Sequence, residues 1–245
     1  TIDPEMINYR HCRVYQNKNR GGSGGFARGM LEVLQNGGFT HVILMDDDIS
    51  LDYIAIKKTV SFLKYMKPEL DTAGIAGGML ERNKPCFQYE ASAKLEKGKL
   101  VHLKNGLNFV NVDSLVINEL EEGGNYGAWW YLCMPVSVIK KHGLPFPFFI
   151  KTDDIEYGLR TLDRVIVMNG IGVWHDSFEG KFSYYLEYYI KRNELVCNAI
   201  HEKHTLFLAV KKLFFGLGKC LASYNYGSVK YITRAFDDYL RGTDF

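Results

Sequence analysis

A short apolar run that ends in three consecutive acids constrains this chain most. Val42–Met45 are four apolar residues, and Asp46, Asp47 and Asp48 follow them directly. An uninterrupted apolar run of this kind fits a strand that is buried on both faces, as in the sheets of α/β proteins. Open α/β sheets bind ligands at the carboxyl ends of their strands. The sequence therefore predicts an α/β fold with the three acids at its ligand-binding edge.

The spacing of these acids predicts a cation site. Side chains alternate along a strand, so Asp46 and Asp48 point to one side and Asp47 to the other if the extended geometry persists. Two converging carboxylates repel each other unless a cation lies between them, and Mg²⁺ and Mn²⁺ prefer oxygen ligands. The glycine and distal glutamate of an EF-hand calcium loop are missing. The alternative interpretation is a helix cap with solvated loop charges.

The chain is expected to form one continuous α/β unit followed by helices. Residues 12–17 are predicted to be a strand that leads into the glycine-rich segment 19–29, with a helix from about Phe26 to Gln35. With the strand before the acids they form a βαβ unit, so we expect a mainly parallel sheet. Turn signals favour hairpins over residues 86–112, and apolar spacing favours a helix from Phe182 to about Ile200. Further expected elements are a helix over 51–67, a strand over 72–80 and helices in 201–245.

Composition excludes several classes of protein. Thirty Lys and Arg against 28 Asp and Glu leave a net charge of +2, whereas a nucleic-acid-binding protein would show a larger basic excess. The five cysteines are scattered and form no CxxC pair, which indicates reduced thiols and no thiolate zinc site. No uncharged apolar run approaches the roughly 18 residues of a membrane span, and the polar start is unlike a signal peptide. We expect a cytoplasmic protein, attached at most to the inner face of the cell membrane.

A second acidic segment follows the stiff sequence PFPFF. It contains Asp153, Asp154 and Glu156. Asp153 and Glu156 have the spacing of a capping box at a helix start, which is a purely structural interpretation. A second carboxylate beside a rigidly placed one also suits a general base. From the residues alone, both interpretations stay open.

Three further features are ambiguous. Trp129 and Trp130 cannot both face one core from a strand, so at least one is expected to be partly exposed and able to stack on sugars; a strand buried on both faces is the alternative. His175 follows an apolar run and is either a buried, hydrogen-bonded histidine or a third metal ligand. The glycine-rich segment either holds a phosphate at a helix start or forms a mobile turn, and its spacing is neither GxGxxG nor a Walker loop.

Taken together, five segments resemble family 2 glycosyltransferases of the GT-A fold, and most closely their bacterial galactofuranosyltransferase branch. In chain order they are NKNRGGSGGFARGM, HVILMDDDIS, YGAWWYLCMP, GLPFPFFIKTDDIEYGLR and IGVWHDSF, and the resemblance runs from about Val14 to Asn198. It implies a Rossmann-like GT-A fold. It also implies that Asp46, Asp48 and His175 hold a divalent cation, Mn²⁺ or Mg²⁺, at the diphosphate of a UDP-sugar donor.

The resemblance also implies roles for other residues. Asp154, or less favourably Asp153, would remove the proton of the acceptor hydroxyl in a single displacement with inversion. The implied nucleotide and phosphate contacts are Asn19, Gly22, Arg28, Asp46 and Asp47. The implied acceptor contacts are Trp129, Trp130, Asp153 and Glu156.

The expected donor is UDP-galactofuranose. The expected acceptor is a lipid-linked or oligosaccharide precursor of a bacterial surface polysaccharide, such as an O-antigen. One alternative is a related transferase with another donor, for instance a rhamnosyl nucleotide. A noncatalytic carbohydrate-binding module is the alternative from a different class, and a homo-oligomer is compatible with either.

The expected organisation departs from the family at the N-terminus. GT-A folds begin with a strand, a helix and a second strand that hold the nucleoside, whereas only about 16 residues precede the glycine-rich segment. We therefore expect that N-terminal strand–helix–strand unit to be missing from a domain over 1–200, followed by a helical extension over 201–245. The extension mixes Lys and Arg with Phe, Leu and Tyr. It is expected to pack against the core or another subunit, with an anionic membrane surface as the alternative partner.

Overall fold

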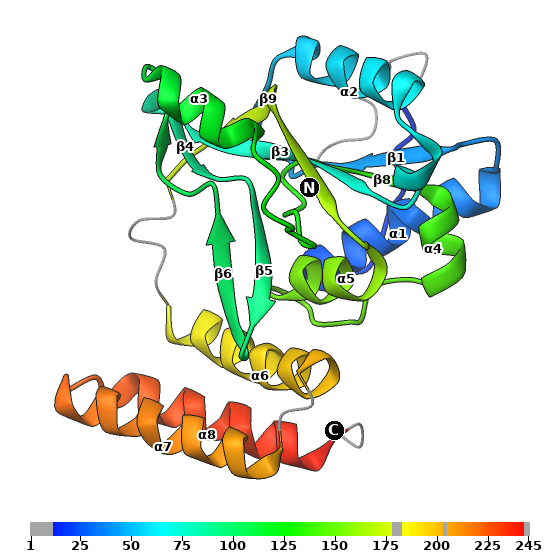
Figure 1. Ribbon diagram of the computed structural model, residues 1–245. Coiled ribbons are helices and arrows are strands. Elements are labelled where there is room, and N and C mark those ends of the chain that lie inside the picture. The colour runs from blue at the N-terminus through cyan, green and yellow to red at the C-terminus, as the bar shows by residue number, and fades with distance from the viewer. Residues whose placement is uncertain (1–11, 178–182, 203–204, 243–245) are drawn as a thin grey trace.

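The computed structural model describes residues 12–177, 183–202 and 205–242, which form a mixed α/β body and a helical C-terminal region (Figure 1). Its helices are α1 (Gly21–Asn36), α2 (Tyr53–Tyr65), the short 3-10 helix η2 (Pro68–Leu70), α3 (Val112–Glu119), α4 (Val136–His142), α5 (Asp153–Thr161), α6 (Tyr184–His201), α7 (Leu206–Ala222) and α8 (Tyr226–Arg241). Its strands are β1 (His41–Leu44), β2 (Ser50–Leu51), β3 (Gly74–Glu81), β4 (Lys84–Glu90), β5 (Ser92–Glu96), β6 (Lys99–Leu103), β7 (Leu107–Asn108), β8 (Leu132–Pro135) and β9 (Val165–His175).

The main sheet is mostly antiparallel. Its strands run in the order β1-β8-β3-β4-β7, with β9 against the other edge of β3 and β2 against β9. Within the described residues, β3 and β9 are the one parallel pair. The expected mainly parallel sheet is therefore wrong. An apolar run reports burial on both faces but not direction, and direction is set by how the chain returns between strands.

The expected βαβ unit at the start of the described chain is also wrong. Residues 12–20 form no strand, and all of their side chains are exposed. A strand needs a hydrogen-bonded neighbour, and no strand of the sheet pairs with this segment. The helix after it, α1, begins at Gly21 rather than near Phe26, so the glycines form its first turns.

The remaining expected elements are confirmed in kind. The helix over 51–67 is α2, the strand over 72–80 is β3, and residues 86–112 contain β4 to β7 with the separate β5–β6 hairpin. The next helix, α6, begins at Tyr184, and Phe182, its expected first residue, lies outside the described residues. Local periodicity and turn chemistry were sufficient for these elements because each is defined over a short stretch of chain.

Helices cover both faces of the sheet, so the body has two apolar clusters. The helices α1, α4 and α5 lie on one side of it and α2 on the other (Figure 1). The first cluster includes Met30 of α1, Ile139 of α4 and Tyr157 of α5. Ile75 and Val173, on β3 and β9, belong to the second cluster, which Ile56 and Phe62 of α2 adjoin. This double covering holds the ends of β1 and β9 in place.

The C-terminal helices form a separate layer below the body. α6 packs on α8, and α7 packs on α8 (Figure 1). Lys212 of α7 donates a hydrogen bond to the Gly98 carbonyl at the tip of the β5–β6 hairpin, 3.0 Å away. On α7, Phe207, Phe214 and Phe215 stay exposed. Among the helices that the structure describes, none is long and apolar enough to cross a membrane.

Candidate active site

The acids after β1 lie in a turn rather than in an extended strand. The strand ends at Leu44, and the chain turns at Asp47 and Asp48. The alternation expected between Asp47 and its two neighbours is therefore not imposed by a strand. β2 follows the turn and pairs with the end of β9, which brings the turn beside His175.

Asp48 is paired with His175. The distance from His175 Nε2 to Asp48 Oδ1 is 3.2 Å. His175 is only 3% exposed, whereas the side chain of Asp48 is 58% exposed, so the acid faces solvent and the imidazole lies beneath it. His175 Nδ1 lies 2.5 Å from the carbonyl oxygen of Asp176. A hydrogen bond at Nδ1 orients the ring so that Nε2 faces the acids, which is the arrangement of a metal-binding histidine.

Arg82 braces this turn, and nothing in the sequence alone selects it. Its guanidinium donates to the Asp48 carbonyl at 2.8 Å and to the Asp176 carboxylate at 3.1 Å. Its backbone N–H also donates to the carbonyl of His175 at 3.0 Å. One side chain at the end of β3 therefore links both chain segments that carry the exposed acids. An isolated arginine beside a turn has no sequence signature of its own.

The pKa of Asp46 reflects the number of carboxylates around it. Burial raises its pKa, the carboxylates of Asp48, Asp47 and Asp153 raise it further, and His175 opposes them. The contribution of Asp153 shows that the second acidic segment lies near the first. Asp47 itself is exposed in the turn.

The donors around this turn suit a hard divalent cation by their chemistry. Two carboxylates and an imidazole match the preferences of Mn²⁺ and Mg²⁺. A cation would relieve the repulsion from neighbouring carboxylates that, after burial, raises the pKa of Asp46. Across the described ranges, no three His, Cys, Asp or Glu side chains are already arranged to hold a metal ion. Of the three expected ligands, Asp48 and His175 are already in contact. Asp46 would have to move toward them to complete a metal site.

The second acidic pair is buried at the start of α5. Asp153 is 9% exposed and Asp154 is partly buried. Burial, followed by the charge of Asp153, raises the pKa of Asp154 to about 7. The hydroxyl of Tyr126 donates to Asp154 Oδ2 at 3.1 Å and opposes that rise. A carboxyl group with a pKa near 7 is suited to accept a proton at neutral pH. Sequence reasoning missed Tyr126, which lies 28 positions away.

The capping-box interpretation of this helix start is wrong. The N-cap is Thr152, which has a φ of 70° and makes no side-chain cap hydrogen bond, and Asp153 is already helical. Glu156 is fully buried and accepts hydrogen bonds from Arg160 at 2.8 and 3.2 Å. His201 Nε2 lies 3.3 Å from Glu156 as well. The structure thus places Glu156 in the support of α5 and away from solvent.

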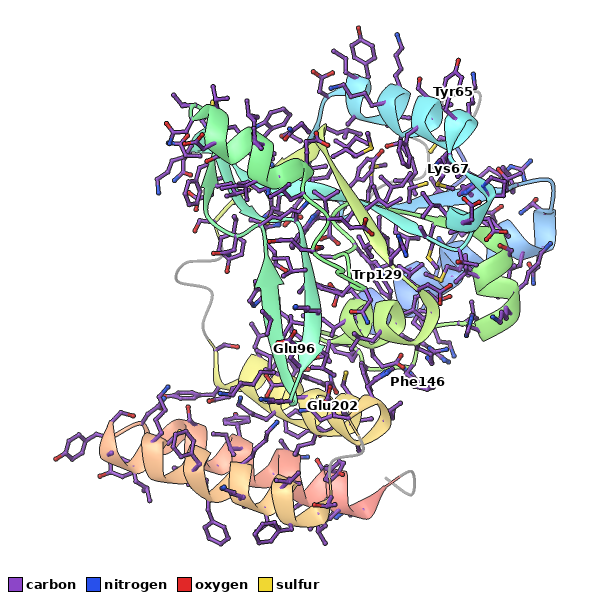
Figure 2. The ribbon with its side chains drawn as sticks, viewed as in Figure 1. Tyr65, Lys67, Glu96, Trp129, Phe146 and Glu202 are labelled. Atoms are coloured by element: carbon purple, nitrogen blue, oxygen red, sulfur yellow. The ribbon has the colours of Figure 1, made fainter. Side chains whose placement is uncertain are left out.

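Both tryptophans are buried, so the expected exposure of one ring is wrong. They lie in a turn before β8, where consecutive side chains reach opposite faces of the sheet, and they are 3% and 6% exposed. Trp130 Nε1 donates to the Gly77 carbonyl at 2.8 Å. Trp129 lies inside the body (Figure 2). Its ring packs against Phe26 and Tyr157, and its buried Nε1 has no hydrogen-bond partner among the residues that the structure describes.

The glycine-rich segment adjoins the buried acids. A Cβ added to Gly22 would lie 3.7 Å from Asp153 Oδ2, so the first turn of α1 passes close to that carboxylate. Asn19 accepts a hydrogen bond from the Gly21 N–H at 3.1 Å and thereby shapes the turn into α1. Arg28 forms an ion pair with Glu32 at 2.6 Å on the same helix. The structure therefore brings Gly22 to the acids, whereas Asn19 and Arg28 are engaged locally.

Two curated proteins are similar to this chain. The galactofuranosyltransferase GlfT2 of Mycobacterium tuberculosis is 28% identical over 251 residues, which cover 94% of this chain and 39% of that protein. The GlfT2 of Mycolicibacterium smegmatis is 24% identical over 248 residues, which cover 94% of this chain and 38% of that protein. The chain thus spans about two fifths of the length of these relatives. The resemblance to galactofuranosyltransferases that the five segments predict is confirmed.

Other comparisons are less informative. No protein-family model matches the chain. The solved structure of the mannosyltransferase PcManGT from Pyrobaculum calidifontis, in complex with GDP-Man and Mn²⁺, aligns with 94% of this chain and 70% of its own at 11% identity and a TM-score of 0.44.

Proposed function

We propose that this relative of the galactofuranosyltransferases is a glycosyltransferase of family 2 with a GT-A fold, which transfers a sugar with inversion and depends on a divalent cation. The observation that carries the proposal is the proximity of two acidic clusters in opposite surroundings. Asp48 is exposed against His175, the partly buried Asp154 accepts a hydrogen bond from Tyr126, and the charge of Asp153 reaches Asp46. The similarity to GlfT2 covers 94% of the chain.

In this proposal the buried pair handles the proton. The acceptor hydroxyl oxygen attacks the anomeric carbon, the bond from that carbon to the diphosphate breaks, and Asp154 takes the hydroxyl proton. With a pKa of about 7, about half of the Asp154 side chains are unprotonated and able to do so at neutral pH. The charge of Asp153 contributes to the raised pKa of Asp154, and Asp153 lies beside Gly22. A single displacement inverts the configuration at that carbon and needs no covalent intermediate.

The acids after β1, together with His175, serve the donor. A divalent cation held by Asp46, Asp48 and His175 would neutralise charge on the departing diphosphate. Asp47, Asn19, Gly22 and the first turns of α1 are the proposed surroundings of the nucleotide. Helix N-termini with glycines present backbone N–H groups that suit phosphates.

The proposed donor is UDP-galactofuranose, and the proposed acceptor is a growing bacterial surface polysaccharide on a lipid carrier. Trp129 supports an acceptor role through its buried Nε1, which has no partner within the described part of the chain and would be satisfied by a sugar oxygen if the turn before β8 opens. α7 carries the exposed phenylalanines Phe207, Phe214 and Phe215 together with Lys211, Lys212 and Lys219 and no acid. That composition suits contact with an anionic membrane surface, where a lipid carrier resides.

The test is transfer from UDP-galactofuranose to a synthetic galactofuranose oligosaccharide in the presence of Mn²⁺, followed by mass spectrometry. The expected product is heavier by one hexose. Asp154→Asn keeps the shape of the side chain but accepts no proton, so transfer should fall by about 10² to 10⁴-fold. Asp163→Asn, at an exposed acid just beyond the C-terminal end of α5, is the matched control and should leave the rate unchanged.

Three outcomes separate the alternatives. Transfer only from a nucleotide-activated rhamnose would replace the donor and keep the mechanism. Binding of the oligosaccharide without transfer from any donor would favour a carbohydrate-binding module. Equal activity of Asp154→Asn and the wild-type chain would remove the proposed base.

A further inference from the structure

The segment before α5 has an unusual backbone. Phe149, Lys151 and Thr152 have φ values of 67°, 66° and 70°, although none of them is glycine. Residues with a Cβ rarely adopt this left-handed region, and they persist there only when the surroundings impose it. Asp153 and Asp154 follow directly. The orientation of both acids therefore depends on whatever holds this segment.

Asn193 of α6 holds it from one side. The residue is fully buried, and its Nδ2 donates to the carbonyl oxygens of Phe148, Ile150 and Lys151 at 3.3, 3.0 and 2.8 Å. An amide group offers two N–H donors, so these three acceptors share them. The Asn193 side-chain oxygen accepts from Arg192 at 2.9 and 3.1 Å, which fixes the orientation of the amide.

Two packing contacts also hold the segment before α5. The ring of Phe149 stacks on Tyr189 of α6, with 5.4 Å between ring centroids. From the opposite side, the glycine-rich segment presses on the same backbone. A Cβ at Gly21 would lie 1.7 Å from the carbonyl oxygen of Phe149, so only glycine fits there. The strained segment is thus held between α6 and α1.

We propose that Asn193 is a positioning residue, whose amide holds the backbone of residues 148–151 so that Asp153 and Asp154 keep their placement at the start of α5. The inference rests on the proposed function, because it assigns Asn193 a part in transfer. Asn193 itself touches none of the reacting groups. Loss of its donors would leave buried carbonyls without partners and let the strained backbone relax. A displacement of an ångström at the base is enough to lower a rate by about 10²-fold.

The test compares two variants of α6. Asn193→Asp keeps the size of the side chain but replaces its N–H donors by a carboxylate oxygen that faces carbonyls. Tyr188→Phe is the matched control, because it removes a buried 2.7 Å hydrogen bond from the same helix to Asp238 of α8 and keeps the aromatic ring that lies against Arg192. Should Asn193→Asp fail to fold, Asn193→Ala replaces it.

Two readouts are needed, one of which is independent of activity. Hydrogen exchange without substrates should be faster by about tenfold or more over residues 148–156 in Asn193→Asp and unchanged there in Tyr188→Phe. In transfer assays, kcat should fall by about 10²-fold in Asn193→Asp, with KM for the donor within threefold of wild type. Tyr188→Phe should retain wild-type kcat.

Unchanged exchange over residues 148–156, an unchanged kcat, or an equal loss of kcat in Tyr188→Phe would each overturn the positioning role. A rise in KM at constant kcat would overturn it too, because it would place Asn193 in donor binding. A wild-type chain that transfers no sugar, whatever its exchange pattern, would remove the proposed function and this inference together. When the wild-type chain does transfer sugar, the hydrogen exchange and kcat of Asn193→Asp test the positioning role alone. Failure of this inference is therefore distinguishable from failure of the proposed function.

Discussion

The acids after β1 and the acids that begin α5 are the same residue type in opposite surroundings. Asp48 is exposed, held by the imidazole of His175 and by Arg82 at its carbonyl. Asp154 is partly buried against Asp153 and Tyr126, and its pKa rises to about 7. An exposed carboxylate is accessible to a cation, whereas burial raises the pKa of Asp154 so that it exchanges a proton near neutral pH. Surroundings, rather than sequence motif, divide the two roles.

The largest expected effect tests the buried pair through pH. Because Asp154 must be unprotonated to accept a proton, transfer should rise nearly tenfold per pH unit below pH 7 and level off above it, a change of about 50-fold from pH 5 to 7. The rate profile at saturating donor and Mn²⁺ measures this, with UDP binding followed over the same range as the control. A profile that is already level at pH 5 would contradict the raised pKa.

The free energy of unfolding should also distinguish Asp154 from Asp48, and here the loss of Asp154 is favourable. The pKa of Asp154 rises from the ordinary value of 3.8 for an aspartate to about 7 in the folded chain, so its ionisation destabilises the fold increasingly from pH 4 to 7. Asp154→Asn removes that penalty and should raise the free energy of unfolding at pH 8 by about 2 kcal/mol, after allowance for relaxation and partial exposure. It should have little effect near pH 4.

Urea unfolding of this variant at both pH values is the measurement. Asp48→Asn, at the exposed position, is the control and should change the free energy of unfolding by less than about 0.5 kcal/mol. An equal change in the free energy of unfolding in Asp154→Asn and Asp48→Asn would contradict the proposed difference in their surroundings.

Tyr126→Phe changes the surroundings of Asp154 without touching Asp48. The phenolic hydroxyl stabilises the charged form of Asp154, so its loss should raise the pKa and move the midpoint of the rate profile up by about half a unit to one unit. Transfer at pH 6 should fall by about three- to tenfold, with recovery at pH 9. Loss of activity that persists at pH 9 would indicate that Tyr126 does more than tune the acid.

The smallest expected effect concerns the exposed pair. Arg82→Ala removes the contacts that link the turn at Asp48 to Asp176, and it should weaken Mn²⁺-dependent UDP binding by about threefold. Calorimetry measures the affinity, and Arg164→Ala, at an exposed arginine paired with Glu121, is the control. The midpoint of the rate profile should not move in either variant; a shift would link the two pairs through Arg82.

The sequence predicted what depends on short stretches of chain. Both acidic segments were recognisable because their residues are consecutive, and α2, β3 and α6 follow from local periodicity. Strand direction was not predictable, because β8 reaches its place between β1 and β3 only through the whole intervening chain. The strand expected at residues 12–17 failed for the same reason. Whether a segment finds a hydrogen-bonded neighbour is decided by the whole fold, and residues 12–20 remain exposed.

The surroundings of the site were equally hidden. Tyr126 and Asn193 reach the segment around Asp154 from 28 and up to 45 positions away. Tyr126 opens the segment YGAWWYLCMP, but nothing local names its partner, and no local pattern marks Asn193. The turn that buries Trp129 and Trp130 on two faces was mistaken for a strand because adjacent aromatic residues fit both. Burial and long-range hydrogen bonds decide the chemistry here, and both arise only in the assembled fold.

The most direct test of the division between the pairs is a calorimetric titration of UDP, with and without Mn²⁺, into the wild-type chain, Asp48→Asn and Asp154→Asn. We expect binding that requires both Mn²⁺ and Asp48, and an affinity of Asp154→Asn within about threefold of wild type, because the buried acid acts on the acceptor proton rather than on the nucleotide. Binding that ignores Mn²⁺, or that is lost in Asp154→Asn and kept in Asp48→Asn, would contradict the account.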